Sequence, residues 1–234
     1  MAAARPVAIP TSRGPIAGLH LAPRGATWLY VFGHGAGAGM RHAFMEDMAA
    51  ALAARAVATL RWEQPAMTAG RGRPDRPEIV EELARAACAY AATSLAKPRR
   101  GSGGLRLCAG GKSMGGRMTS NAQARGAMPG IEALVFLGFP LHPAGEPATK
   151  RADHLAAVTL PMLFISGTKD ALAEPALLRP VVAALPTARL VELAGADHGL
   201  DVPKKAGFDP IARAADDIVA FLGSLRIAPA ARIP

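Results

Sequence analysis

Apolar residues along the chain fall into two kinds of segment that alternate. Short continuous apolar runs are typical of strands buried on both faces. They predict strands at residues 28–32, 57–62, 105–109, 131–137, 161–167 and 188–193. Longer segments with apolar residues at helical spacing lie between these runs and predict helices. These helices are expected at residues 42–55, 77–95, 114–124, 175–185 and 210–225.

This alternation predicts an α/β fold with a mainly parallel sheet and helices on both of its faces. Residues 7–10 and 15–21 are expected to add two antiparallel strands at the edge of the sheet. No repeat or second domain is visible in the sequence, so residues 1–234 are predicted to be one domain with a flexible tail over residues 227–234. The short segment between the strands ending at 137 and starting at 161 leaves room for a minimal cap at most.

One strand-to-helix turn carries candidate chemistry. Residues 111–115 read Gly-Lys-Ser-Met-Gly and follow the predicted strand at residues 105–109. Gly-x-Ser-x-Gly in this context is the nucleophile elbow pattern, in which the serine sits on a strained turn with its hydroxyl exposed. Glycine is needed two positions before and after Ser113, because such a turn leaves no room for a nearby Cβ. The elbow alone is a short motif, so other parts of the chain must agree with it.

Two further polar residues follow other predicted strands. Asp170 comes after the strand at 161–167, and His198 comes after the strand at 188–193. Ligands of such sheets bind beyond the carboxyl ends of the strands, so we expect these residues to meet Ser113 there. The order Ser, Asp, His is the one expected for the α/β-hydrolase fold.

The chemistry assigns a role to each of these residues. Ser113 is the candidate nucleophile, and His198 would take its proton and return it to the leaving group. Asp170 would hold the imidazole tautomer and stabilise the imidazolium. Asp170 could instead cap the following helix. Asp197 is a competing acid, but it directly precedes His198, and adjacent side chains diverge in extended backbone.

A glycine-rich loop at residues 33–39 supplies candidate backbone donors. We expect the oxyanion hole to use the backbone N–H of Met114 and a second N–H from Ala36 or its neighbour Gly35. His34 is interpreted as a structural hydrogen-bonding residue under this loop. No cofactor or metal is expected, since His34 and His42 lack an accompanying Cys pair or His-Glu-x-x-His motif.

The loops at residues 63–77 and 141–152 are expected to shape the pocket. His142 and His154 are candidates either to line this pocket or to lie on the surface, and the sequence does not choose between the two.

The chain carries a formal net charge of +9, mostly from arginine. Basic clusters lie at residues 71–76 and 97–100, but aromatic residues make up only 5% and none interleaves with these clusters. This composition favours solvated loops over a nucleic-acid site. Cys88 and Cys108 are interpreted as two buried, reduced thiols. With no signal peptide and no long apolar run, we expect a cytoplasmic protein without a membrane partner.

Several motifs together resemble a known group. They are residues 34–38 (His-Gly-Ala-Gly-Ala), 111–117 (Gly-Lys-Ser-Met-Gly-Gly-Arg), 136–143, 167–170 and 197–200. The chain resembles the KANL/Tex-type α/β-hydrolase-like family, which is related to dienelactone hydrolases. The resemblance covers nearly the whole chain and implies the α/β-hydrolase fold, with Ser113, Asp170 and His198 matching the triad. It implies no substrate, and the chain departs from dienelactone hydrolases proper in having serine, not cysteine, at the elbow.

Two functions therefore compete. The first is a serine hydrolase that acts on an ester, thioester or related acyl bond of a small molecule. The second is a catalytically silent domain that binds a protein partner, because relatives of this kind include a domain of a chromatin acetylation complex. The intact triad and glycine loop favour the first, since a scaffold needs neither.

Overall fold

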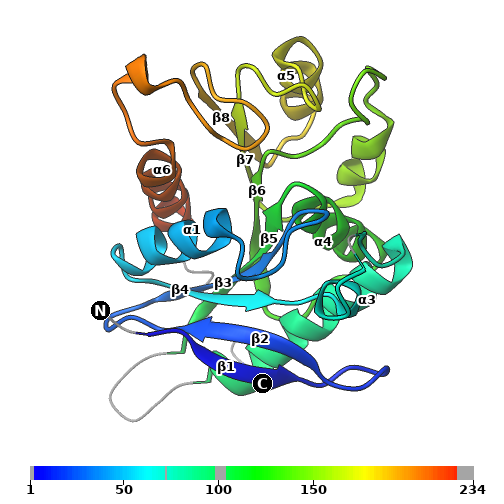
Figure 1. Ribbon diagram of the computed structural model, residues 1–234, viewed down its shortest axis with the longest axis vertical. Helices are drawn as coiled ribbons and strands as arrows, with labels where there is room; N and C mark the ends of the chain where they lie inside the picture. The colour runs from blue at the N-terminus through cyan, green and yellow to red at the C-terminus, as the bar shows by residue number, and fades with distance from the viewer. Residues whose placement is uncertain (1–2, 72, 98–103, 226–234) are drawn as a thin grey trace, which may run out of the picture.

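The computed structural model describes residues 3–71, 73–97 and 104–225, and its centre is an eight-stranded sheet. The strand order is β1-β2-β4-β3-β5-β6-β7-β8 (Figure 1). The strands are β1 (Arg5–Ile9), β2 (Ile16–Leu21), β3 (Trp28–Gly33), β4 (Val57–Trp62), β5 (Arg106–Lys112), β6 (Ile131–Leu137), β7 (Met162–Gly167) and β8 (Ala188–Leu193). β1 pairs antiparallel with β2, and β2 with β4, whereas the other neighbours pair parallel. The predicted sheet is therefore confirmed, including its antiparallel edge.

Helices cover both faces of this sheet, as the sequence pattern predicted. The α-helices are α1 (Ala43–Ala53), α2 (Pro65–Thr68), α3 (Pro77–Tyr90), α4 (Met114–Arg125), α5 (Pro175–Ala183) and α6 (Pro210–Ser224). A π-helical turn, η1 (Ala91–Leu95), extends α3, and the 3₁₀ helices are η2 (Lys150–Ala157) and η3 (Lys204–Ala206). Figure 1 shows α1 and α6 on one side of the sheet and α3 and α4 on the other. Of the described helices, none combines the length and apolar character that crossing a bilayer requires.

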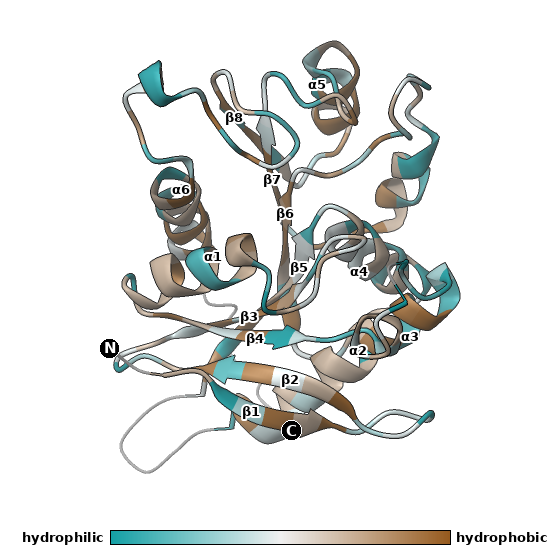
Figure 2. Ribbon diagram, viewed as in Figure 1, coloured by the Kyte–Doolittle hydropathy of each residue, from teal (hydrophilic) through white to brown (hydrophobic). Residues whose placement is uncertain are grey.

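The strands form because their side chains are buried on both faces. Every residue of β3, β4 and β7 is buried, as expected for continuous apolar runs under two helical layers. Figure 2 shows these strands as largely hydrophobic, with hydrophilic residues gathered on loops and outer helix faces. The predicted tail at residues 227–234 and most of the 97–100 basic cluster lie outside the described residues. In the other basic cluster, Arg71, Arg73 and Arg76 are exposed.

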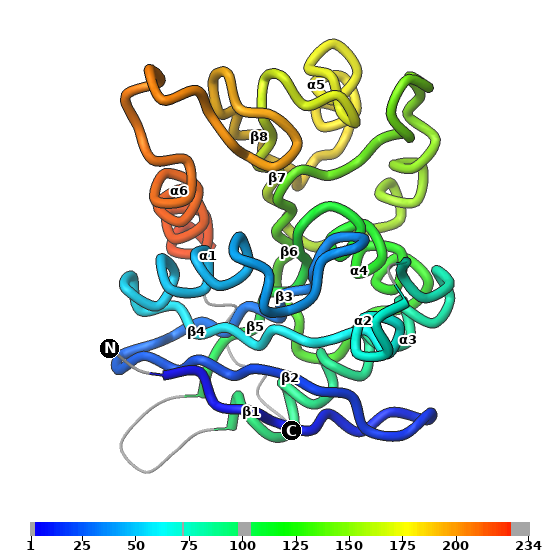
Figure 3. Tube along the Cα trace, viewed as in Figure 1, coloured from blue at the N-terminus to red at the C-terminus, as the bar shows by residue number. Residues whose placement is uncertain are grey.

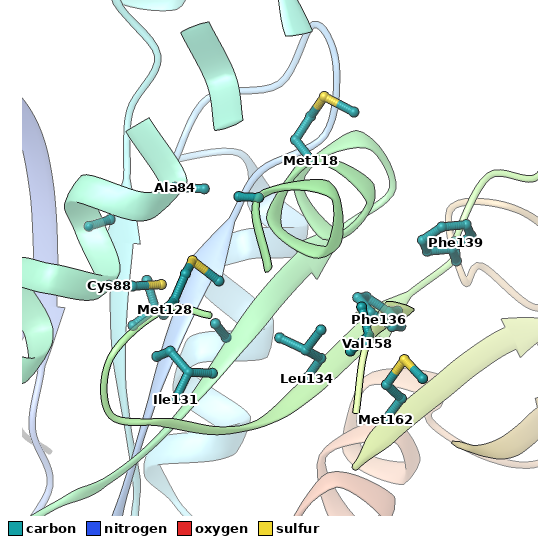
Figure 4. Packing of buried hydrophobic residues seen from close by; sticks show 14 of the residues in the cluster. Ala84, Cys88, Met118, Met128, Ile131, Leu134, Phe136, Phe139, Val158 and Met162 are labelled. Carbon is teal, nitrogen blue, oxygen red and sulfur yellow. The ribbon is translucent and has the colours of Figure 1, made fainter. Parts of the chain in front are cut away.

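Two hydrophobic clusters hold the layers together. One cluster lies under α3, α4 and α5 and includes Phe164 together with Phe136 and Phe139, the last two of which are labelled in Figure 4. The Phe136 ring lies 5.2 Å from that of Phe139 and 4.8 Å from that of Phe164, measured between centroids. The other cluster lies under α1 and α6. Cys88 and Cys108 are buried free thiols in different clusters, which agrees with their interpretation from the sequence.

The structure corrects three element boundaries. β5 continues to Lys112, beyond the predicted end at residue 109, because glycines pair in register with β3 there. A short helix, α2, interrupts the predicted loop at residues 63–77. The 3₁₀ helix η2 starts at Lys150, inside the predicted loop at residues 141–152. Figure 3 follows the β6–β7 segment, in green to yellow-green, as it leaves the sheet and passes beside α4. We call this short segment the cap; none of its described residues lines the cavity that contains Ser113 and His198.

Close backbone contact at the start of α4 leads to a stability prediction. A Cβ placed on Gly115 would lie 2.4 Å from Gly33 O and 2.6 Å from His34 O. Both neighbours are backbone atoms, which cannot rotate away. Gly115→Ala is therefore expected to lower the free energy of unfolding by about 2–3 kcal/mol, measured by urea denaturation.

Gly223→Ala is the matched control for this prediction. Gly223 also lies in a helix, α6, but a Cβ there meets no atom within 4 Å. Alanine has the higher helix propensity, so this variant is expected to be as stable as the wild type or more stable by up to about 1 kcal/mol. Equal effects of the two substitutions would contradict the steric argument.

Candidate active site

Ser113 occupies the strained turn that the elbow pattern predicts. It connects β5 to α4 with φ 51° and ψ −118°, a conformation that few residues with a Cβ adopt. Such backbone costs about 1–3 kcal/mol and persists only where the surroundings impose it. Here the Ser113 N–H donates to Leu137 O at 2.9 Å, which ties the turn to the end of β6. The turn lifts the hydroxyl above the carboxyl edge of the sheet.

A continuous chain of hydrogen bonds joins the three residues singled out from the sequence. His198 Nε2 lies 2.8 Å from Ser113 Oγ. On the other side of the ring, His198 Nδ1 lies 2.9 Å from both carboxylate oxygens of Asp170. The Asp170 side chain is 0% exposed and that of His198 is 26% exposed. The imidazole is therefore accessible to solvent, whereas the carboxylate behind it is not.

The parallel strands bring these residues together from distant parts of the chain. Ser113 follows β5, Asp170 follows β7, and His198 follows β8, all at the same edge of the sheet. A Cβ on Gly167, at the end of β7, would lie 2.1 Å from Ala196 O. The missing side chain lets the loop after β7 pack against the loop after β8. This contact sets the spacing between the carboxylate and the imidazole.

The two alternatives considered for the acidic residue are resolved by hydrogen bonds. Asp170 Oδ1 accepts the Leu172 N–H at 2.8 Å, but α5 begins only at Pro175, so this is a turn and not a helix cap. Asp197 bonds within its own loop, where its Oδ1 accepts the Asp201 N–H at 3.0 Å. Of the two acids, only Asp170 contacts the imidazole of His198.

The glycine-rich loop after β3 lies against the serine. A Cβ on Gly35 would be 3.6 Å from Ser113 Cβ, and the Ala38 N–H donates to Gly35 O at 3.3 Å in a tight turn. Gly35 and Ala36 line the same cavity as Ser113. Met114 is the first residue of α4, where helical N–H groups have no partner within the helix. The assignment of these residues to an oxyanion hole stays a prediction.

His34 stabilises this loop through contacts of its two ring nitrogens. It is fully buried, with its Nδ1 2.8 Å from Gly35 O and its Nε2 2.9 Å from Glu63 Oε1. Both ring nitrogens are therefore engaged in holding the loop. This matches the structural role expected for His34.

Lys112 is a site residue that the sequence reasoning missed. Its Nζ donates to His198 O, and its ammonium lies 5.5 Å from the centroid of the Phe44 ring. Burial lowers the pKa of Lys112 to about 8, against the opposing effect of nearby carboxylates, of which Asp170 is the largest. Gly138, with φ 64°, makes room for it, since a Cβ there would lie 2.8 Å from Lys112 Nζ. The sequence signal that could have identified Lys112 was a lysine three residues after the apolar run predicted as a core strand at residues 105–109.

Two cavities are lined by residues near the elbow or on the helix that follows it. The first, called here the triad cavity, has a volume of about 580 Å³. Its lining is mainly apolar and includes Phe44, Leu172 and Ile211 beside Ser113 and His198. It lies between α1, the glycine-rich loop and the start of α6.

The second, called here the cap cavity, has a volume of about 550 Å³. It lies between α4 and the β6–β7 segment. His142 and His154 both line this cavity, and neither lines the triad cavity, so the pocket expected for them is not the one that contains Ser113 and His198. The described residues of the 63–77 loop line neither of the two cavities, so the expectation that they shape this pocket is wrong. Across the described ranges, no group of three or more His, Cys, Asp or Glu side chains gathers as a metal site.

The topology and this constellation together define a class of protein. A family model for the alpha/beta hydrolase domain matches residues 26–223. The chain therefore belongs to the α/β-hydrolase family. No curated protein matches the sequence. The narrower resemblance to the KANL/Tex-type group stays a prediction.

Solved structures with this fold include three that cover nearly all of the chain. Dienelactone hydrolase from Anabaena variabilis is 20% identical with a TM-score of 0.75, over 96% of this chain and 99% of that one. Est1E from Butyrivibrio proteoclasticus, with ferulic acid bound, is 16% identical with a TM-score of 0.74, over 93% and 99%. An alpha-beta serine hydrolase homologue from Coxiella burnetii is 16% identical with a TM-score of 0.70, over 95% and 99%. At these identities the likeness shows the fold alone.

The burial of Lys112 predicts a pH dependence of stability. As the pH rises past about 8, the folded protein releases the Lys112 proton, whereas an unfolded lysine keeps its proton to about pH 10.4. The unfolded state then binds more protons, so this group makes stability rise with pH. The free energy of unfolding of the wild type, minus that of Lys112→Met, is expected to increase by about 1 kcal/mol from pH 7 to pH 9.

Urea denaturation of both proteins at three pH values in this range measures the difference. Lys205→Met serves as the control, because Lys205 is exposed and its loss should leave the slope with pH unchanged. Parallel pH profiles for the wild type and Lys112→Met would show that the ammonium is not buried in solution.

Proposed function

We propose that this protein is a serine hydrolase that cleaves an ester, thioester or related acyl bond of a small molecule. The observation that carries the proposal is the hydrogen-bonded chain from Ser113 through His198 to Asp170. Membership of the α/β-hydrolase family supports the same reading.

In this mechanism, Ser113 Oγ attacks the carbonyl carbon of the substrate while His198 Nε2 takes the hydroxyl proton. The tetrahedral intermediate carries a negative oxygen, which the backbone N–H groups of Met114 and of Ala36 or Gly35 would stabilise. The intermediate collapses to an acyl-enzyme as His198 gives the proton to the departing alcohol or thiol. Water, deprotonated by His198, then attacks the acyl carbon; the bond to Ser113 Oγ breaks, Ser113 Oγ takes the proton back from His198, and a carboxylic acid is released.

Asp170 would keep the imidazole in the tautomer with its proton on Nδ1, which leaves Nε2 free to accept. Lys112 would hold the His198 loop through its bond to His198 O. Est1E has been solved with ferulic acid bound, and a carboxylic acid is the product class of the proposed reaction.

A fluorophosphonate probe tests the nucleophile. Ser113→Ala is expected to lose labelling and to lose hydrolysis of short p-nitrophenyl esters, because the substitution removes the hydroxyl that would form the acyl-enzyme. Mass spectrometry of the labelled protein and release of p-nitrophenolate are the measurements.

Ser120→Ala is the matched control. Ser120 also lies in α4 and bonds a histidine, with its Oγ 2.7 Å from His154 Nε2, but it is fully buried. This variant should still be labelled. Absence of labelling and of turnover in the wild type would favour the catalytically silent domain instead.

Replacing the acid tests the role of the tautomer. In Asp170→Asn the amide oxygen is expected to keep the hydrogen bond from the Leu172 N–H. The amide NH₂ then faces His198 Nδ1. The imidazole proton would move to Nε2, where it blocks proton transfer from Ser113. We expect kcat for a p-nitrophenyl ester to fall by about 10³–10⁴-fold with KM nearly unchanged. A loss of less than tenfold in a folded variant, checked by circular dichroism, would show that Asp170 does not orient the base.

A further inference from the structure

The cap cavity contains an arginine whose Nε has no hydrogen-bond acceptor among the described residues. This residue, Arg117, lines the cavity from α4, and its Nε is buried. No ion pair within 4.0 Å involves its guanidinium in the same part of the chain. A buried guanidinium nitrogen left unpaired is destabilising, so its retention calls for an explanation.

Arg117 is one helical turn from the candidate nucleophile. Its backbone N–H donates to Ser113 O at 3.1 Å. Helical side chains lean toward the N-terminus of their helix, so the Arg117 stem starts out toward the Ser113 end of α4. Four residues span about 6 Å along a helix axis, so a molecule bound by Arg117 would have to extend about that far along α4 to reach Ser113.

The surroundings of Arg117 bring like charges together. Besides burial, the charge of Arg151 lowers the pKa of Arg117, and only Glu81 opposes these effects. Glu81 is itself paired with Arg125, at 2.9 Å. Lys150 adds a third cation to the cavity lining. The acids of the lining, Glu146 and Asp153, are both exposed.

The two histidines of the cavity add no free charge. His142 is paired with Glu174, and the distance from His142 Nε2 to Glu174 Oε2 is 2.6 Å. Burial first, and then the charge of Arg117, lower the pKa of His154 to about 4, so His154 is neutral near pH 7. The unpaired positive charge of the cavity therefore resides on Arg117, Arg151 and Lys150.

We propose that the cap cavity binds an anionic group of the acyl substrate, a carboxylate or a phosphate, through Arg117 and Arg151. This inference rests on the proposed function, because it names the substrate class of the same site. A guanidinium matches the two oxygens of such groups with parallel hydrogen bonds. The scissile acyl carbon would lie at Ser113 while the anion lies on the cap side of α4. The apolar triad cavity would take the uncharged part of the molecule.

Matched esters test this assignment. The anionic substrate is the p-nitrophenyl half-ester of glutaric acid, and its neutral counterpart carries a methyl ester on the second carboxyl. In Arg117→Gln, KM for the half-ester is expected to rise about 10–100-fold, while KM for the neutral ester stays within about twofold. Arg117→Lys should recover part of the loss. Equal changes for both esters, or no change for either, would overturn the proposal.

Two further variants complete the set. Arg24→Gln removes the same charge from an exposed position before the amino end of β3, away from the carboxyl edge that carries the site, and should change neither KM. Arg151→Gln should raise KM for the half-ester in the same direction as Arg117→Gln. If Arg117→Gln does not fold, Arg151→Gln decides the matter on its own.

Binding without turnover separates this inference from the proposed function. In the Ser113→Ala background, glutarate and inorganic phosphate are each added in a thermal unfolding experiment, with dimethyl glutarate as the neutral control. At least one of the two anions is expected to raise Tm, and Arg117→Gln should abolish the rise. The larger rise identifies carboxylate or phosphate as the preferred group. The inference is overturned if neither anion raises Tm or if the rise survives Arg117→Gln. If the wild type lacks esterase activity but the anions still bind, only the proposed hydrolase function is rejected.

Discussion

The candidate site depends on one constraint, the close approach of backbone to backbone where β5 leads into α4 beside the end of β3. A Cβ on Gly111 or Gly115 would lie 2.2 or 2.4 Å from Gly33 O. The chain can close this junction only with glycine, and the closed junction forces Ser113 to φ 51°. The strain at the serine is thus sustained by packing nearby, as expected for a residue held in a sparsely populated conformation.

Close packing also fixes the positions of Asp170 and His198 relative to Ser113. Asp170 is fully withdrawn from water, and its carboxylate accepts hydrogen bonds from His198 and from the Leu172 N–H. Buried charge is tolerated when it is paired and hydrogen-bonded in this way. Lys112, at the end of β5, adds a partly buried cation that donates a hydrogen bond to the His198 carbonyl. The imidazole is therefore held from two sides, and little reorganisation is needed before it can accept a proton.

The elbow also separates two environments of similar volume. The triad cavity is mainly apolar, whereas the cap cavity presents Arg117, Lys150 and Arg151, and the acids of its lining, Glu146 and Asp153, are exposed. A molecule that spans both would carry an apolar part on one side of the reacting carbon and a negative charge on the other. Substrate choice would then follow from where the short β6–β7 segment lies against α4, since this segment supplies Arg151.

The sequence by itself determined the strands, the main helices, the parallel sheet and the three residues of the hydrogen-bonded chain. These follow from local hydrophobic period and from the rule that loops after parallel strands share one edge. Three features could not be predicted from the sequence. They are the partial burial of Lys112, the pairing of His142 with Glu174, and the Arg117 Nε that lacks an acceptor among the described residues. Each depends on which side chains from distant segments face one another, and only the tertiary structure decides that, because charge and burial are properties of the packed neighbourhood.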